Sequence, residues 1–327
     1  MRTIKKRRVR NLLLFFPMVL LITLLSFAVV YFSPGDAGRL LLRQHLHRAA
    51  VTEQQGQEYA RRLGIDGGFG QMYGRWLYQV VQGDFGTSLS TGEKVNHLFW
   101  TKYRITLMMA FLSAGFEILL AFPISLRAGV RPGGFCDRLV SLWSVVSFAI
   151  PAFWIGLVSL WLLAMKLHWQ EAIGYSGIRS LLIPAFIMGC ISCGQLGRIL
   201  RSRSREAAES GFVEFARSQG LRERDILRHH ILPHVLPSSI AVLVLDVSGF
   251  VGGALLMEKI FNIPGFSGML FQAIEVKDYP LISGSLFFIS VLICALNLLA
   301  DSIYPNLDIR NQSELHGVKQ EGGSPVE

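Results

Sequence analysis

Residues 12–32 read LLLFFPMVLLITLLSFAVVYF, and this stretch decides the fold class of the chain. It contains no charged side chain, and a helix needs about 20 apolar residues to cross the hydrocarbon core of a bilayer. Because lipid offers no partner to backbone N–H and C=O groups, such a run is expected to be helical. Five further runs of this kind follow, at residues 105–126, 139–165, 180–197, 235–257 and 281–300. The sequence therefore predicts an all-α polytopic membrane protein with six transmembrane helices.

The composition of the whole chain agrees with this prediction. Of its 327 residues, 51% are hydrophobic and 17% charged, whereas a soluble domain carries about a quarter charged residues. An ordinary cytosolic enzyme and a disordered chain are both excluded on these grounds. The run at 12–32 is too long for the apolar part of a secretory signal peptide, and no small-x-small cleavage site follows it. We expect it to be a retained membrane anchor.

The positions of Lys and Arg predict the orientation, because cytoplasmic loops carry an excess of basic residues. The N-terminus is strongly basic, and residues 198–233 carry eight arginines. The segments 166–180 and 258–280 carry only two Lys or Arg residues each. We therefore expect a multi-pass protein with both termini in the cytoplasm. The net charge of +9 then reflects membrane topology rather than the binding of nucleic acid.

The predicted spans divide the chain into parts. These are a cytoplasmic N-terminus with the first helix (1–33), an extracytoplasmic loop (34–104), a core with helices two to six (105–304) and a cytoplasmic tail (305–327). Apolar residues at helical spacing predict amphipathic helices in the extracytoplasmic loop, namely Leu63, Met72, Trp76, Leu77 and Val80. These helices are expected to lie on the outer face, either packed on the rim of the core or contacting a partner.

No motif of nucleotide or covalent chemistry occurs in the chain. A P-loop, a nucleophile elbow, a zinc-protease motif and a dinucleotide-binding glycine motif are all absent from the sequence. Cys190 and Cys193 have zinc-site spacing but lie inside the fourth run, where a thiol behaves as a small apolar residue. We expect no catalytic residue, no metal site and no cofactor. Energy for uphill transport must then come from an ion gradient or from another subunit.

Two acidic residues, Glu117 and Asp246, lie near the middle of their apolar runs. A charge at the bilayer centre costs at least about 2.5–3.5 kcal/mol, so both side chains should face a cavity, a partner or another subunit. They either belong to a translocation path or form a structural hydrogen bond between helices. Gly249, Gly252 and Gly253 are expected to allow close contact between helices.

Residues 205–233 read REAAESGFVEFARSQGLRERDILRHHILP and are too polar to span a membrane. Phe212, Phe215 and Ala216 stand at i, i+3 and i+4, which predicts one apolar helical face. Gly220 predicts a sharp turn, and a second amphipathic helix is expected to end at the final proline of the stretch. Two short helices of this kind would present a compact knob to a partner. The other interpretation is an interfacial helix bound to lipid headgroups.

This segment is similar to the EAA loop of permease subunits of binding-protein-dependent ABC importers. E-F-A-R-S-Q-G at residues 214–220 and I-L-P at residues 231–233 stand where that family has E-A-A-x-x-x-G and then I-x-L-P. In the family the loop forms a coupling helix that contacts an ATPase subunit. The resemblance assigns this contact to Glu214, Phe215, Ala216, Gly220, Ile231, Leu232 and Pro233.

Nearly the whole chain resembles one branch of that superfamily, the dipeptide, oligopeptide and nickel permeases. The matching motifs include G-D-F-G-T-S at 83–88, I-P-A-F-W at 150–154 and D-Y-P at 278–280. The resemblance implies a type I importer permease (MetI-like) fold in the bacterial inner membrane, forming a path for small peptides, nickel or metal-chelator complexes. The implied partners are a second homologous permease subunit, two ATPase subunits, an extracytoplasmic solute-binding protein and membrane lipid.

Two other classes of function stay open at this level. An ion-coupled secondary carrier would use Asp246 or Glu117 as a proton site and would transport as a lone subunit. A membrane scaffold or sensor would use residues 198–233 as a signalling dock. Replacing Gly220 by a bulky β-branched residue separates these classes, because only the importer is expected to lose ATPase coupling while it still inserts normally.

Overall fold

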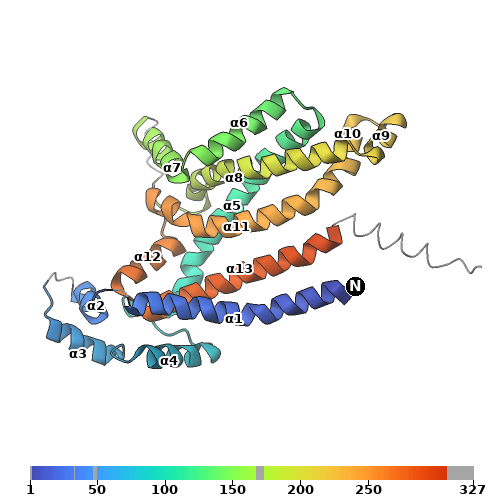
Figure 1. Ribbon diagram of the computed structural model, residues 1–327. Coiled ribbons are helices and arrows are strands. Elements are labelled where there is room, and N and C mark those ends of the chain that lie inside the picture. Colours follow the sequence, from blue (N-terminus) through green and yellow to red (C-terminus); the bar gives the residue numbers. More distant parts are fainter. Residues whose placement is uncertain (1, 33, 47–49, 167–172, 308–327) are drawn as a thin grey trace, which may run out of the picture. The chain divides into compact units, whose positions relative to one another are not determined.

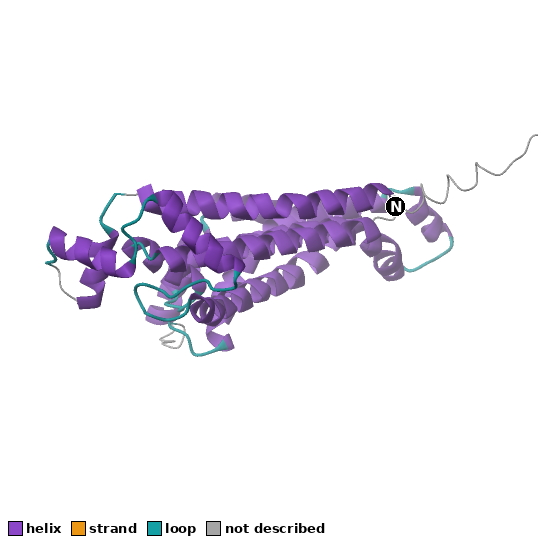
Figure 2. Cartoon of the chain, turned by 90° about the horizontal axis from the view of Figure 1, so that it is seen from below, coloured by secondary structure: helices purple, strands orange, loops and turns teal. Residues whose placement is uncertain are grey.

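The computed structural model describes residues 2–32, 34–46, 50–166 and 173–307 (Figure 1). The predicted tail lies outside these residues from position 308 onward. Within the described ranges every regular element is a helix, as Figure 2 shows. The chain divides by packing into two compact units, one of Met1–Leu107 with Asn262–Ala295 and one of Met108–Phe261 with Leu296–Glu327.

In the described part of the chain, five helices are long and apolar enough to cross a membrane. They contain or coincide with Phe15–Phe32, Val95–Val130, Ile178–Ala208, Glu223–Ile260 and Tyr279–Leu298. The sixth expected run, residues 139–165, is not one helix but a pair bent by 93°. The described residues thus hold five continuous candidate spans, and six when the bent pair counts as one.

The bend in the third run has a local cause. Helix α6 (Phe135–Ala149) ends before Ile150, whose φ of −104° and ψ of 121° are extended. Helix α7 (Ala152–Trp161) then begins after Pro151 and continues as a π turn, Leu162–Lys166. Proline lacks the N–H that a helix interior needs and disfavours helical geometry in the residue before it. The expectation of a single continuous helix here is wrong for this reason.

The first unit packs around the aromatic side of α1. Its helices are α1 (Arg2–Phe32), α2 (Ala37–Leu46), α3 (Glu53–Leu63), α4 (Phe69–Val81), the start of α5 (Val95–Val130), α12 (Phe266–Val276) and most of α13 (Tyr279–Leu307). Phe27 of α1, Trp76 of α4 and Ile282 of α13 belong to one buried cluster. The amphipathic helices predicted in residues 34–104 are therefore present as α2, α3 and α4, with Met72 and Trp76 turned inward.

Asp278 fastens a loop of the first unit to the start of α13. This fully buried carboxylate accepts hydrogen bonds from Ser88 Oγ at 2.6 Å, Ser90 N at 3.0 Å and Ser90 Oγ at 2.9 Å. Its other oxygen accepts from Leu281 N at 3.3 Å, as a helix N-cap does. Burial lowers the pKa of the neighbouring Lys277, and the Asp36 carboxylate opposes that shift.

The second unit is a bundle whose helices approach closely at glycines. It contains the rest of α5, then α6, α7, α8 (Ile178–Ala208), α9 (Gly211–Ser218), α10 (Glu223–Ile226) and α11 (Leu232–Ile260). A Cβ on Gly189 of α8 would lie 2.4 Å from the carbonyl oxygen of Ser113 on α5. Small residues let membrane helices pack this tightly. In contrast, a Cβ on Gly249, Gly252 or Gly253 would meet nothing within 4 Å, so among the described residues of this chain no helix makes the expected close contact at these three glycines.

Candidate functional site

A glycine turn separates α9 from α10, where the sequence predicts it. Gly220 has a φ of +76°, a conformation that glycine adopts without steric cost. Its N–H donates to the Arg217 carbonyl at 2.9 Å, and the Leu221 N–H donates to the Ala216 carbonyl at 3.3 Å. This pair of bonds is the Schellman pattern that closes a helix. A Cβ at Gly220 would meet nothing within 4 Å, so the turn depends on backbone conformation and not on space.

Helix α9 has one face against the protein and one face toward the outside. Val213 and Ala216 are buried in a cluster with Leu200 of α8. Phe212 and Phe215 are 43% and 65% exposed. The expectation that Phe212, Phe215 and Ala216 form a single apolar face is therefore wrong. The helix carries two neighbouring apolar stripes, and packing against α8 covers the stripe of Val213 and Ala216.

The segment after the turn runs directly into a membrane-spanning helix. Helix α10 continues through a π turn (Leu227–Ile231) into α11, so Glu223–Ile260 forms one helix of 38 residues. Pro233 stands in the first turn of α11 and does not end a helix as expected. Proline has no N–H to donate to the preceding turn, and here the preceding turn is the π turn Leu227–Ile231 rather than a regular α-helical turn. The segment after the Gly220 turn is therefore continuous with the membrane-spanning part of α11.

The remaining residues predicted for this segment divide between the two faces. Glu214 is exposed beside Phe215, whereas Ile231 is fully buried in the same cluster as Val213. Leu232 and Pro233 are half-buried at the start of α11. The structure thus brings these residues into one knob formed by α9, the Gly220 turn and α10, with Glu214 and Phe215 on its outer side.

Arg217 is a residue of the knob that the sequence pattern does not single out. Its Nε donates to Glu223 Oε1 at 3.0 Å across the glycine turn, and one terminal nitrogen donates to the Ala208 carbonyl at 3.3 Å. These bonds connect α9 with α10 and with the end of α8. The two charges stand six positions apart, a spacing that the helical i, i+3 and i, i+4 rules do not detect.

Glu117 and Asp246 come together inside the second unit. Glu117 of α5 is fully buried, and its side chain contacts that of Asp246 on α11. Both oxygens of Glu117 and Oδ2 of Asp246 have no hydrogen-bond donor among the described residues. Ionised carboxylates only accept, so a hydrogen bond between the two groups requires one of them to carry a proton. The pair is thus suited to link α5 and α11 in a protonated form.

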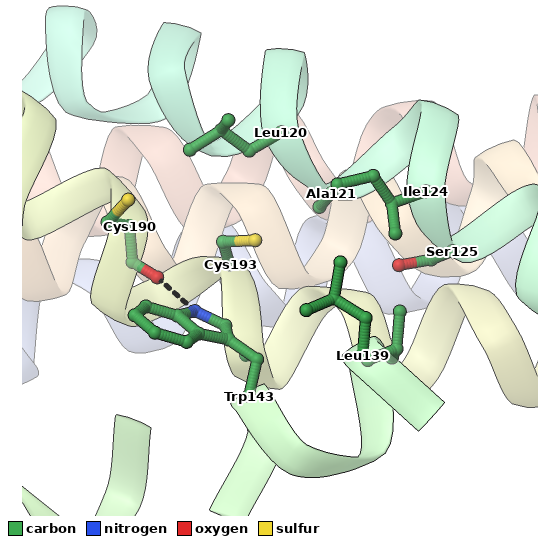
Figure 3. Close-up of a pocket in the computed structure, with 10 residues that line it drawn as sticks. Leu120, Ala121, Ile124, Ser125, Leu139, Trp143, Cys190 and Cys193 are labelled. Atoms are coloured by element: carbon green, nitrogen blue, oxygen red, sulfur yellow. Dashed lines mark hydrogen bonds between the residues drawn. The ribbon is translucent and has the colours of Figure 1, made fainter. Parts of the chain in front are cut away.

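Cys190 and Cys193 line an apolar cavity of about 140 Å³ between α5, α6 and α8 (Figure 3). Trp143 Nε1 donates to the Cys190 carbonyl at 2.8 Å and closes one side of it. The two sulfur atoms point in different directions (Figure 3). Both thiols are free, and they occupy the position of small apolar side chains in this wall.

The chain matches the family described as "Binding-protein-dependent transport system inner membrane component" over residues 121–312. This match covers most of the second unit, including the knob and Asp246, whereas Glu117 lies just before it. The chain belongs to this family. It is a multi-pass inner-membrane permease component of an ABC importer, and the resemblance that the motifs predict is confirmed.

Relatives of known name extend the similarity over the whole chain. The permease is 28% identical over 313 residues to the oligopeptide transport system permease protein AppB of Bacillus subtilis, covering 92% of this chain and 98% of that protein. It is 26% identical over 306 residues to the nickel import system permease protein NikB of Staphylococcus aureus, covering 93% and 91%. These similarities include the first unit.

A solved structure supports the fold of the core. The inward-facing methionine ABC transporter MetNI aligns with a TM-score of 0.52 at 20% identity, covering 64% of this chain and 96% of that chain. At this identity the likeness establishes the fold alone. The predicted type I importer permease fold is confirmed.

Proposed function

We propose that the knob couples this permease to ATP hydrolysis by a separate subunit. The observation that carries the proposal is the division of α9 into a fixed inner face and an exposed outer face. Val213 and Ala216 anchor the helix in the bundle, while Phe215 and Glu214 are exposed, and none of the described residues covers the aromatic ring. Aromatic side chains are enriched in protein interfaces, where they act as anchors.

The geometry supports a lever mechanism. A partner that binds Phe215 and moves would displace α9. The Arg217–Glu223 ion pair and the hydrogen bonds of the Gly220 turn connect α9 to α10, so α10 would move with it. Since α10 is continuous with α11, the displacement reaches the membrane-spanning part of the bundle. The permease itself supplies no chemistry in this mechanism and acts as a non-catalytic gate.

The named relatives support a proposal for the partners and the solute. We infer that two ATPase subunits bind on the cytoplasmic side, that a second homologous permease completes the path, and that a solute-binding protein delivers the solute from outside. The relatives named for oligopeptides and nickel support a small peptide or a nickel or metal-chelator complex as the solute. Both termini lie in the cytoplasm in this arrangement, as the Lys and Arg distribution predicts.

The carboxyl pair is a second part of the proposal. The complete burial of Glu117 and its contact with Asp246 favour a structural hydrogen bond between α5 and α11. A place in the translocation path stays a prediction for Asp246, which is only half-buried. The family assignment does not favour an ion-coupled carrier that uses these groups as its proton site.

The coupling role is tested by truncating the exposed ring. Phe215→Ala removes the outer contact without touching the buried face, so the permease should insert normally and lose co-purification with the ATPase subunits. Tyr78→Ala is the matched control, because Tyr78 of α4 is 68% exposed and lies outside the knob. ATPase binding that survives Phe215→Ala, or that falls equally with Tyr78→Ala, contradicts the proposal.

A further inference from the structure

A cavity of about 990 Å³ lies between the end of α5, the turn into α6 and the α10 segment. Four arginines line it from two sides, Arg127 and Arg131 from the α5 side and Arg224 and Arg228 from the α10 side. None of its lining residues belongs to α9. The volume is at the upper end of the range for small-molecule sites in proteins. The cavity is therefore large enough for a charged group together with part of an apolar chain.

The charges of the cavity favour an anion. Among the described residues, none of the four guanidinium groups is bonded to a carboxylate. Two acidic residues also line the space, and one of them, Glu223, is already bonded to Arg217. Among the described lining residues, Asp225 is then the one carboxylate without an ion pair, and it is outnumbered by four arginines. Guanidinium groups bind phosphate oxygens in pairs of parallel hydrogen bonds, which makes phosphate the anion that fits best.

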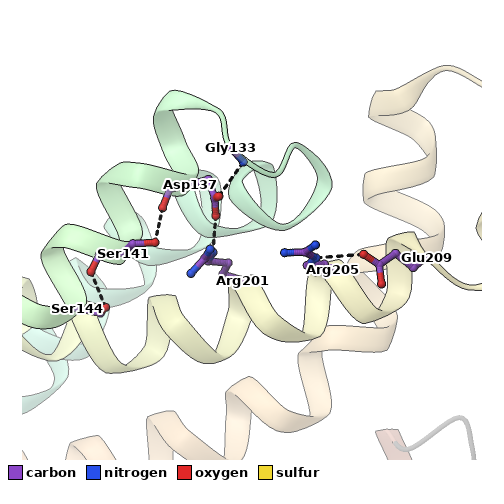
Figure 4. A network of polar contacts seen from close by, with 7 residues as sticks. All are labelled: Gly133, Asp137, Ser141, Ser144, Arg201, Arg205 and Glu209. Atoms are coloured by element: carbon purple, nitrogen blue, oxygen red, sulfur yellow. Dashed lines mark hydrogen bonds and ion pairs between the residues drawn. The ribbon is translucent and has the colours of Figure 1, made fainter.

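Both walls of the cavity are held in place without the arginines. On one side, a Cβ on Gly129 of α5 would lie 2.4 Å from Ser204 Cβ of α8, so the two helices touch there. Asp137 forms an ion pair with Arg201 of α8 and accepts a hydrogen bond from the Gly133 N–H at 2.8 Å (Figure 4). These contacts fix the turn that carries Arg131.

The opposite wall is fixed by burial. Ile226 and Ile231 are fully buried and flank the positions of Arg228 and Leu227. Arg224 and Arg228 stand four residues apart and so lie on one face of the helix. Because neither guanidinium group holds the fold together, both can be replaced without unfolding the knob.

The apolar part of the lining decides between a soluble anion and a lipid. Leu126, Val130 and Leu227 line the same space as the arginines, and Phe135 at its edge is 81% exposed. A soluble phosphate compound would leave this apolar surface uncovered, whereas a phospholipid covers it with its acyl chain. The Lys and Arg distribution places both arginine-bearing segments on the cytoplasmic side, and basic pockets on that side of membrane proteins bind anionic headgroups.

We propose that this cavity binds an anionic phospholipid of the cytoplasmic leaflet. Arg127, Arg131, Arg224 and Arg228 surround the headgroup phosphate, and an acyl chain lies along Leu126 and Val130. The lipid bridges the α5–α6 turn and α10, so its binding stabilises the arrangement of the knob relative to α5. The proposal is independent of the coupling role, because the outer face of α9 takes no part in it.

The test measures the affinity of the purified full-length chain for cardiolipin and for phosphatidylcholine by native mass spectrometry in detergent. The variant Arg224→Gln/Arg228→Gln removes two arginines from one wall. The control Arg203→Gln/Arg222→Gln removes two arginines outside the cavity, which are exposed as the four lining arginines are. A third variant, Arg224→Lys/Arg228→Lys, keeps the charge and shows whether the fold tolerates substitution at these positions.

We expect the cavity variant to weaken cardiolipin binding about 30-fold, with a much smaller effect in the control. The lysine variant keeps the charge but not the paired hydrogen bonds, so its loss should lie between that of the control and that of the glutamine variant. Phosphatidylcholine binding should be weak throughout. An equal loss in the control, or unchanged cardiolipin binding in the cavity variant, overturns the proposal. So does displacement of cardiolipin by equimolar inorganic phosphate, which identifies a site for a free anion. In the complete importer, loss of ATPase co-purification by the cavity variant together with unchanged cardiolipin binding would identify a protein contact and would also overturn the proposal.

Discussion

The glycine turn of the knob gives the sharpest test of the lever. In Gly220→Val a β-branched side chain must adopt a φ of +76°, which costs about 1–3 kcal/mol. No neighbouring atom lies within 4 Å of the new Cβ, so the whole effect comes from the backbone. Relaxing the turn breaks the two hydrogen bonds to the Arg217 and Ala216 carbonyls, each of which contributes about 1 kcal/mol.

These magnitudes predict the result. A strain of about 1–3 kcal/mol lowers the population of the native turn by roughly 5- to 150-fold, because about 1.4 kcal/mol is a factor of ten. The membrane-spanning part of the helix is apolar and distant in sequence, so insertion should be normal. We expect ATP hydrolysis that is no longer stimulated by the solute-loaded binding protein.

Two matched variants separate backbone strain from side-chain bulk. Gly220→Asn should retain most of the coupling, since asparagine tolerates positive φ. Gly211→Val adds the same side chain at the start of α9, where φ is not positive and a Cβ meets nothing within 4 Å. The assay is ATP hydrolysis by the complete importer in proteoliposomes, with insertion followed by membrane fractionation. Normal coupling in Gly220→Val, or equal loss in Gly220→Asn, would falsify the lever as described.

Three further results follow from the packing. Glu117→Gln should leave the melting temperature in detergent nearly unchanged, because an amide donates to Asp246, whereas Glu117→Ala should destabilise by about 1–3 kcal/mol; equal melting of the two variants argues against the pair. Gly189→Ala should destabilise by about 1–3 kcal/mol and Gly252→Ala should not, because of these two glycines only Gly189 faces a backbone oxygen. Thermal unfolding of both variants measures this difference. Asp278→Ala should lower stability more than Asp278→Asn, because the amide keeps an acceptor for the loop hydroxyls; the reverse order in the same assay contradicts this role.

The candidate site was only partly predictable. The turn at Gly220 follows from the sequence, because a glycine after an amphipathic stretch is a local signal. The sequence does not predict which stripe of α9 is buried, because Phe212 and Phe215 have a periodicity as regular as that of Val213 and Ala216. Which stripe meets the bundle depends on where α8 lies, and no local rule contains that information.

The contact between Glu117 and Asp246 is also not predictable from local sequence. Their positions within apolar runs predict that each needs a partner. The partner itself is set by the packing of α5 against α11, two helices far apart in the chain. The close approach at Gly189, in place of the three glycines of α11, is also a property of helix packing.

What the sequence by itself determined is the five continuous membrane-crossing helices of the described residues and the turn at Gly220. Each of these depends on residues close together in the chain, namely apolar length and a permitted positive φ. Only the tertiary structure decided the inner face of the knob, the carboxyl pair and the arginine-lined cavity. These features join residues from separate helices, and helix packing depends on the shapes of whole surfaces that no short stretch encodes.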